Sequence, residues 1–371
     1  MIIGIPKEIK DQENRVAIIP GAVTELSKKN EVFIEKGAGL GSGITDEDYI
    51  EAGASILDTA KEVWEKADMI YKVKEPLEEE YQYFREGLII YTYLHLASNL
   101  ELAKKMVDTG VIGIGYETVQ LEDRSLPLLR PMSEIAGRMA VQEGASYLTK
   151  PNGGRGILLQ GVPGVRPAHV VIVGAGVVGT GATRIAVGMG ARVTVLDVNI
   201  NALTAITNIF PDKVETLYSN PLNIEESLKT ADLVISTVLI PGRKAPQLIK
   251  EDMVKQMKEG SVIVDVAIDQ GGSTDLTKGH PTTHTDPTFV KYDVIHYAVA
   301  NIPGAVAMTS TYALSNATTR YAKAIADMGL EAACQRFPEL ESGINTYKGH
   351  VTYQPVAEDL ELEYKQLDFA E

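Results

Sequence analysis

A glycine-rich segment near the middle of the chain has the residue types and spacing of a dinucleotide-binding turn. Gly174, Gly176 and Gly179 follow an apolar, β-branched run in the order G-x-G-x-x-G. The first glycine permits a tight turn, the second lets the backbone approach a pyrophosphate, and the third allows a helix to pack closely on the strand. Because strand, turn and helix patterns occur together, the sequence predicts a bound dinucleotide.

An acidic residue at the end of the next predicted strand indicates which dinucleotide binds. Asp197 closes the apolar run 193–196 and lies 21 residues beyond Gly176. At that distance an acid accepts hydrogen bonds from the adenosine ribose hydroxyls and repels a 2′-phosphate, so the sequence favours NAD over NADP. A second glycine-rich stretch, 37–43, has Ser42 where the third glycine should be, and we predict a loop there.

Two basic side chains in the first hundred residues could hold an anionic substrate. Hydride removal from a carbon that bears nitrogen or oxygen needs an anion clamp, a group that moves protons and a place for water or ammonia. Arg15, which lies between the opening strand and Pro20, could grip a carboxylate with two nitrogens, or it could be a surface charge. Lys74 ends the apolar run 69–73, where it could reach a substrate or lie at a solvated strand end.

A histidine supplies the proton-transfer chemistry. His95 ends the apolar run 88–94 and is one of only six histidines in the chain. Imidazole titrates near neutrality, so this side chain could give a proton to a substrate oxygen or take one from it. A structural histidine is the alternative interpretation.

The predicted sheet in the second half of the chain places several residues at its ligand-binding edge, beyond the carboxyl ends of its strands. Asp269 follows the predicted strand 262–266 and precedes two glycines, which favours a functional carboxylate there. Asn301 follows the predicted strand 294–298, where its amide could bond the nicotinamide carboxamide. The same argument places against the cofactor Val238, Leu239, Ala267, Ile268, Asp269, Val299, Ala300 and Ile302.

Alternating strand and helix patterns predict an α/β protein with two doubly wound domains. In the second half we expect strands at 170–173, 192–196, 214–217, 233–236, 262–266 and 294–298. The first half alternates in the same way, with strands expected at 32–34, 68–73, 88–93 and 111–116. We therefore predict a Rossmann NAD-binding domain over 131–304 and a discontinuous substrate-binding domain over 1–130 plus 305–371. Helices at 133–148 and 311–328 would flank an interdomain cleft.

Composition excludes several classes of function. The net charge of −15 argues against a nucleic-acid partner, whose phosphates need a basic surface. The single cysteine, Cys334, cannot form an intrachain disulfide, and no Cys/His cluster has metal-ligand spacing. The sequence begins with a strand-like run rather than a signal peptide and has no apolar run long enough to cross a bilayer. We expect a cytoplasmic protein without metal or membrane contacts, whose acidic C-terminal tail is a solvated surface segment.

Several blocks of sequence resemble the family of L-alanine dehydrogenases and the NAD-binding subunits of proton-translocating transhydrogenases. The similarity spans essentially the whole chain, at 4–8, 13–17, 72–76, 94–97, 131–138, 174–179, 265–272, 296–304 and 309–311. It implies an NAD-dependent, reversible oxidative deamination of L-alanine to pyruvate and ammonium by a homohexamer. His95 and the segment 267–272 distinguish this activity from that of the transhydrogenase relatives.

The resemblance also assigns roles to residues. Arg15 and Lys74 would bind the carboxylate and carbonyl region of the substrate, His95 would be the acid/base, and Asp269 would be the second catalytic group. The family's cofactor contacts correspond to Ser133, Asp197, Ser219, Val238, Leu239 and Asn301.

The chain departs from the family pattern in two places. Lys278-Gly279-His280 stands where many relatives have a shorter connection with an arginine, which puts a cofactor role of Lys278 or His280 in doubt. The segment 306–309 replaces a proline and a basic pair. Two other functions remain open: a saccharopine-type amino-acid dehydrogenase, and an NAD-binding module that works only within a membrane complex.

Overall fold

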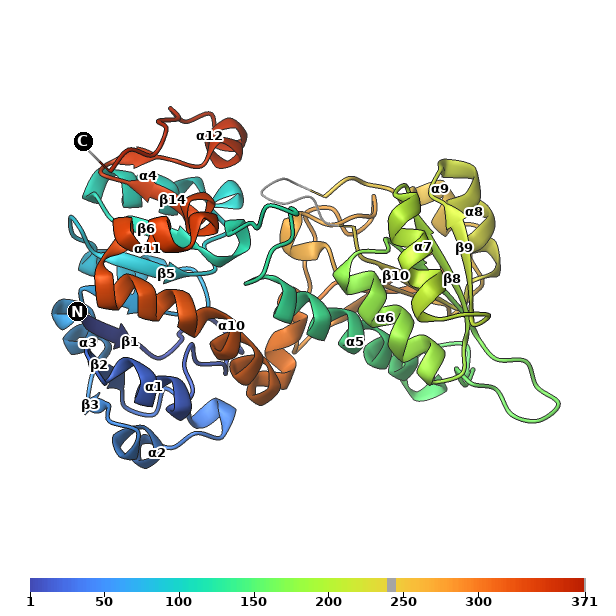
Figure 1. The fold of residues 1–371 in the computed structure, drawn as a ribbon. Helices are drawn as coiled ribbons and strands as arrows, with labels where there is room; N and C mark the ends of the chain where they lie inside the picture. The colour runs from blue at the N-terminus through green and yellow to red at the C-terminus, as the bar shows by residue number, and fades with distance from the viewer. Residues whose placement is uncertain (239–244, 370–371) are drawn as a thin grey trace. The chain divides into compact units, whose positions relative to one another are not determined.

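The computed structural model describes residues 1–238 and 245–369, which divide into two compact units (Figure 1). The first unit contains residues 1–132 and the chain from 306 onward, and the second contains 133–238 and 245–305. Each unit is built around its own sheet. No helix within the described residues is long and apolar enough to span a membrane.

The sheet of the first unit has eight strands, in the order β15-β14-β6-β5-β4-β1-β2-β3. The six strands from β3 to β6 run parallel, whereas β14 pairs antiparallel with β6 and with β15. The strands are β1 Ile2–Ile5, β2 Glu31–Glu35, β3 Ser55–Leu57, β4 Met69–Tyr71, β5 Ile89–Thr92, β6 Ile112–Gly115, β14 Ile344–Tyr347 and β15 His350–Val351. Parallel strands need covered faces, and the near-continuous apolar runs of β4 and β5 are fully buried.

Helices from both ends of the chain cover this sheet. They are α1 Pro20–Leu26, α2 Asp46–Glu51, α3 Ala60–Lys66, α4 Leu100–Thr109, α10 Ala307–Met328, α11 Leu330–Arg336 and α12 Gln354–Leu360. Helix α10 packs beside α1, and its Thr318 carbonyl accepts a hydrogen bond from the Tyr91 hydroxyl at 3.1 Å. The carboxylates of the acidic tail are exposed, but Val356 and Ala357 of α12 are buried against the core. The tail is therefore a packed part of this unit and not only a solvated segment.

The second unit has the strand order of a classical dinucleotide-binding fold. Its seven-stranded sheet runs β12-β13-β11-β10-β7-β8-β9, which, counted from β7 as strand 1 and without the edge strand β12, is the order 3-2-1-4-5-6. The strands are β7 His169–Val173, β8 Arg192–Asp197, β9 Val214–Tyr218, β10 Leu233–Ser236, β11 Val262–Asp265, β12 Thr288–Lys291 and β13 Val294–Tyr297. All pairs are parallel except β12 with β13. The predicted doubly wound α/β fold is confirmed.

The helices of this unit lead into the sheet or connect its parallel strands. They are α5 Arg130–Tyr147, which starts in the last residues of the first unit, α6 Val177–Gly188, α7 Ile200–Ile209, α8 Pro221–Thr230 and α9 Glu251–Val254. A core of buried residues from β7, β8, β10, β11 and β13 lies against α8 and α9. Because these strands are parallel, their carboxyl ends lie at the same edge of the sheet. The loops that carry the predicted cofactor residues begin there.

The glycine-rich stretch 37–43 forms a loop with one 3-10 turn, Leu40–Ser42, rather than a nucleotide-binding turn. Its glycines serve close packing, because a Cβ atom on Gly41 would lie 2.7 Å from the carbonyl oxygen of Asn14.

Candidate active site

The turn between β7 and α6 has the geometry that a dinucleotide phosphate requires. Gly174 has φ +110°, and a Cβ there would lie 2.5 Å from the Thr237 hydroxyl oxygen. A Cβ on Gly179 would lie 1.9 Å from the carbonyl oxygen of Gly174, so only glycine fits. A Cβ on Gly176 would meet nothing within 4 Å, which leaves open space at the start of α6. The open position coincides with the N-terminus of a helix, where the backbone attracts anions.

The carboxylate of Asp197 is fixed beside this turn. Its Oδ2 accepts a hydrogen bond from the backbone N–H of Ala175 at 2.6 Å, and its Oδ1 accepts one from Asn199 N–H at 2.7 Å. The N–H of Ser219 donates to the Asp197 carbonyl oxygen at 3.0 Å. The ends of β8 and β9 and the glycine turn are thus tied together, and the half-buried carboxylate is held by the backbone.

The loops after β11 and β13 meet at Asp269. This residue lies in the 3-10 turn Ile268–Gln270, its side chain is exposed, and its Oδ2 accepts a hydrogen bond from Asn301 N–H at 3.2 Å. Asn301 adopts the left-handed conformation with φ +67°. The Nε2 of His284 lies 3.3 Å from the Asn301 carbonyl oxygen, to which it donates. A carboxylate and an amide at matching strand ends therefore share one edge of the sheet.

The other predicted cofactor residues have different exposures at the same strand ends. Ala267, Ile268, Val299 and Ile302 are buried, whereas Val238, Ala300 and Ser219 are half-buried. Ser133 is half-buried in the first turns of α5. Leu239 lies outside the described residues.

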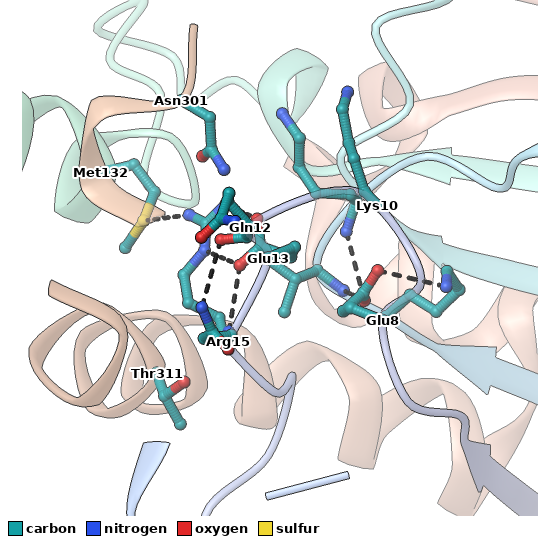
Figure 2. Close-up of polar contacts among 12 residues, drawn as sticks. Glu8, Lys10, Gln12, Glu13, Arg15, Met132, Asn301 and Thr311 are labelled. Carbon is teal, nitrogen blue, oxygen red and sulfur yellow. Dashed lines mark hydrogen bonds and ion pairs between the residues drawn. The ribbon is translucent and has the colours of Figure 1, made fainter. Parts of the chain in front are cut away.

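Arg15 is a buried guanidinium rather than a surface charge, with 2% of its surface exposed. Its Nε donates to Glu13 Oε1 at 2.7 Å and one terminal nitrogen donates to Glu13 Oε2 at 2.5 Å, while the other approaches the Met132 sulfur at 3.2 Å (Figure 2). Burial alone would lower the pKa of Arg15, but the Glu13 carboxylate raises it above its ordinary value. The arginine stays charged and its planar group is held by a two-pronged acidic partner.

Lys74 is also buried, and the carboxylates of Glu75 and Glu8 lie beside its side chain and its backbone. Its Nζ lies 3.9 Å from Glu75 Oε2, and its backbone N–H faces Glu8 Oε1 at 3.4 Å. Burial would raise the pKa of Glu75, but the neighbouring Lys74, His95 and Lys10 side chains lower it to about 2. Glu75 is therefore a permanent anion within a cluster of cationic groups.

His95 is held in an unusual backbone conformation. It has φ +49°, in the left-handed region that residues other than glycine seldom adopt. The buried carboxylate of Glu117 accepts the N–H of His95 at 2.7 Å and that of Leu94 at 3.2 Å. The imidazole stacks on Tyr93 with ring centroids 5.9 Å apart and planes within 13°. The backbone and the ring are thus both fixed, although the side chain remains half-exposed.

Sequence reasoning missed the acids that orient these groups. Glu13 and Glu75 stand two residues and one residue from the basic side chains they hold, so acid–base proximity could have found them. Glu117 lies 22 residues beyond His95, and no local pattern connects the two. His284 contacts Asn301 because the loop that carries His284 pairs with the segment that follows β13. No local sequence pattern indicates this pairing.

Comparison with known proteins agrees with this arrangement. Residues 4–136 match the model described as the alanine dehydrogenase/PNT N-terminal domain, and residues 140–354 match its C-terminal domain. The chain belongs to the alanine dehydrogenase/PNT family. An alanine dehydrogenase from Methanococcus maripaludis is 60% identical over 365 residues, which cover 98% of each chain.

Two solved structures extend the similarity within the alanine dehydrogenase/PNT family. An L-alanine dehydrogenase has 48% identity and a TM-score of 0.91, with 97% of this chain and 99% of that chain covered. A transhydrogenase from Sinorhizobium meliloti has 26% identity and a TM-score of 0.81, with 95% and 100% covered.

The residues present fit the nicotinamide dinucleotide that members of the family use. The open space beside Gly176 suits a pyrophosphate, and the Asp197 carboxylate lies at the end of β8, three strands along the sheet from β11, which Asp269 follows.

Proposed function

We propose that this protein is an NAD-dependent L-alanine dehydrogenase that catalyses the reversible oxidative deamination of L-alanine to pyruvate and ammonium. The observation that carries the proposal is 60% identity to a named alanine dehydrogenase across 98% of both chains. The structure supports the same chemistry. The first unit contains two buried cations, Arg15 and Lys74, together with His95, and the second unit contains the glycine turn of a dinucleotide-binding fold.

In this proposal the first unit binds the amino acid. Arg15, oriented by Glu13, contributes a permanent positive charge for the substrate carboxylate. Lys74 contributes a second cation for the carboxylate and carbonyl region. Glu75, as a permanent anion next to Lys74, balances part of this positive charge.

The second unit holds the cofactor. Gly174, Gly176 and Gly179 shape the turn for the pyrophosphate, and Asp197 selects NAD by accepting from the ribose hydroxyls. Ser133, Ser219, Val238, Leu239, Ala267, Ile268, Val299, Ala300, Asn301 and Ile302 complete the proposed contacts. Bound NAD⁺ supplies the hydride acceptor for the α-carbon of alanine.

His95 and Asp269 move the protons of the remaining steps. Loss of the α-hydride leaves an iminium form of the substrate, to which water adds while a base takes one of its protons. The carbinolamine then loses ammonia as its hydroxyl proton is removed, which gives pyruvate. His95 is the acid/base at the substrate oxygen, and Asp269 is the second group, presented by the hydrogen bond from Asn301 N–H. The sum is alanine, NAD⁺ and water to pyruvate, ammonium, NADH and a proton.

Two further statements belong to this proposal. We infer a homohexamer, as the family resemblance implies, which light scattering of the purified protein would test. We also infer a cytoplasmic location from the single cysteine, Cys334, which is a free, buried thiol.

An NAD-binding module of a transhydrogenase-like complex is the second candidate, because a transhydrogenase matches over 95% of the chain. Identity favours the dehydrogenase, at 60% against 26%. The module would bind NADH tightly and leave alanine untouched.

The deciding experiment is formation of NADH, followed by near-ultraviolet absorbance, when the purified chain meets NAD⁺ and L-alanine. D-alanine, L-lysine and NADP⁺ serve as controls. Reduction with L-alanine and NAD⁺ alone supports the proposal. Oxidation of NADH that needs lysine together with a 2-oxo acid would support a saccharopine-type enzyme, and NADH binding without turnover would support the module.

A further inference from the structure

A carboxylate that the proposed chemistry does not use is completely buried at the end of β11. Asp265 has 0% of its surface exposed. Its oxygens accept hydrogen bonds from Ala267 N–H at 3.0 Å, from Ser273 N–H at 2.8 Å, from Ser273 Oγ at 2.7 Å and from Thr277 Oγ1 at 2.5 Å. Each oxygen therefore has two donors.

This buried carboxylate has no cationic partner among the residues that the structure describes. Moving an unpaired carboxylate out of water costs several kcal/mol, which oriented hydrogen bonds must offset. Four donors from one short segment provide that compensation here. Asp265 and the segment 267–277 consequently depend on each other, because all four donors to the carboxylate come from this segment.

The segment that Asp265 holds is the one that presents Asp269. The donors at Ala267 and Ser273 lie on either side of Asp269, so the carboxylate closes both ends of its turn. Between them Gly271 and Gly272 adopt φ +93° and +84°, and Gly272 N–H donates to the Ala267 carbonyl oxygen at 3.2 Å. This backbone path points Asp269 outward, where its side chain is exposed.

Neighbouring strands and loops brace the same arrangement. The Ser273 hydroxyl lies 2.7 Å from that of Ser236, at the end of β10. Thr274 Oγ1 lies 2.8 Å from Thr277 Oγ1 and accepts the Thr277 N–H at 3.0 Å. The hydroxyl of Thr277 is fixed toward Asp265 by these contacts.

We propose that Asp265 is a positioning residue, which sets the reactivity of Asp269 by holding the two ends of its turn through Ala267 and Ser273, with the Thr277 hydroxyl as a further donor that fixes the carboxylate. The proposal rests on the function proposed above, in which Asp269 is a catalytic residue. Asp265 is completely buried, and its effect passes through the backbone of 267–273.

The test removes a single donor and leaves the charge in place. Thr277→Val deletes the hydroxyl at nearly constant volume, and Thr277→Ser keeps it. A hydrogen bond to a buried charge is strong enough that its loss should lower kcat about tenfold. We expect the KM for L-alanine and the Kd for NADH to change less than about twofold, and Thr277→Ser to recover kcat.

A matched control separates positioning from general destabilisation. Thr194→Val, on β8, also deletes a buried hydroxyl of the same unit, which bonds His169 on β7 and Glu215 on β9 and not the Asp269 turn. It should lower the unfolding temperature and leave kcat unchanged. Should Thr277→Val not fold, Ser273→Ala, which keeps the backbone donor, is measured in its place.

The outcomes are distinguishable. Wild-type kcat in Thr277→Val, equal loss in Thr194→Val, or a parallel change of kcat, KM and NADH affinity would overturn the positioning role alone. Absence of alanine turnover in the wild-type chain would overturn the proposed function, and this inference with it.

Discussion

At the scale of single residues, the candidate site consists of cations and a histidine whose geometry is set by acids. Glu13 holds Arg15, Glu117 holds the backbone of His95, and Glu75 lies near Lys74. Sequence reasoning proposed the chemistry-bearing residues from their types and positions, and their roles stay predictions. It did not find Glu117, because a partner 22 residues away appears only when β5 and β6 are side by side.

The clearest prediction for a single residue concerns the loss of activity when His95 is replaced. His95→Ala should lower kcat by about a hundredfold or more, since it removes the group that moves protons at the substrate oxygen. Steady-state rates with L-alanine and NAD⁺ measure the loss, and NADH fluorescence titration checks that the cofactor still binds. Near-normal turnover with intact NADH binding would remove His95 from the mechanism.

We expect the carboxylate of Asp197 to determine the selectivity for NAD⁺ over NADP⁺. Asp197→Ala should weaken discrimination against NADP⁺, because the carboxylate that repels a 2′-phosphate is gone. The ratio of kcat/KM for NAD⁺ to that for NADP⁺ is the quantity to measure. An unchanged ratio would exclude Asp197 from the ribose site.

At the scale of elements, apolar runs of four to six residues revealed the parallel strands, as in β7 and β11, because both faces of such strands are buried. The short edge strands β3, β12 and β15, and β14 beside β15, escaped prediction. The residues of β12 are half-buried or exposed, and β15 has only two residues. No apolar run therefore marks these strands in the sequence. Edge strands depend on pairing partners that the local sequence does not contain.

Helix α6 offers a matched pair of glycine substitutions. Gly179→Ala should weaken NADH binding by more than about tenfold, because its Cβ would lie 1.9 Å from the Gly174 carbonyl oxygen and displace the turn. Gly188→Ala, in the same helix, meets nothing within 4 Å and should leave binding unchanged while stabilising the helix by about 0.5–1 kcal/mol. Fluorescence titration and thermal unfolding measure both. Equal NADH affinity in the two variants would contradict the packing role of Gly179.

At the scale of the whole molecule, two buried histidines of the second unit link its stability to pH. Burial lowers the pKa of His169 and of His296 to about 4. His169 faces the charges of Arg192, Asp232 and Lys258, and the ring of His296 stacks on Phe289 at 4.8 Å.

The sign of the linkage follows from these lowered values. Below the unfolded pKa of about 6.5 the unfolded chain takes up protons that the folded chain refuses, so stability falls as the pH drops from about 6.5 to about 4. Each histidine contributes about 3 kcal/mol over that window. His296→Phe keeps a ring against Phe289 and removes one titration, so the difference in unfolding temperature between about pH 7 and about pH 5 should shrink. A difference as large as that of the wild type would show that His296 does not contribute.

In the proposed function, this chain transfers a hydride from the α-carbon of L-alanine to NAD⁺. The most direct measurement is mass spectrometry of the products formed from L-alanine deuterated at Cα and NAD⁺. We predict one deuterium in the NADH, none in the pyruvate, and ammonium in equal amount. NADH without deuterium, or no product from L-alanine while NADH binds normally, would contradict the account.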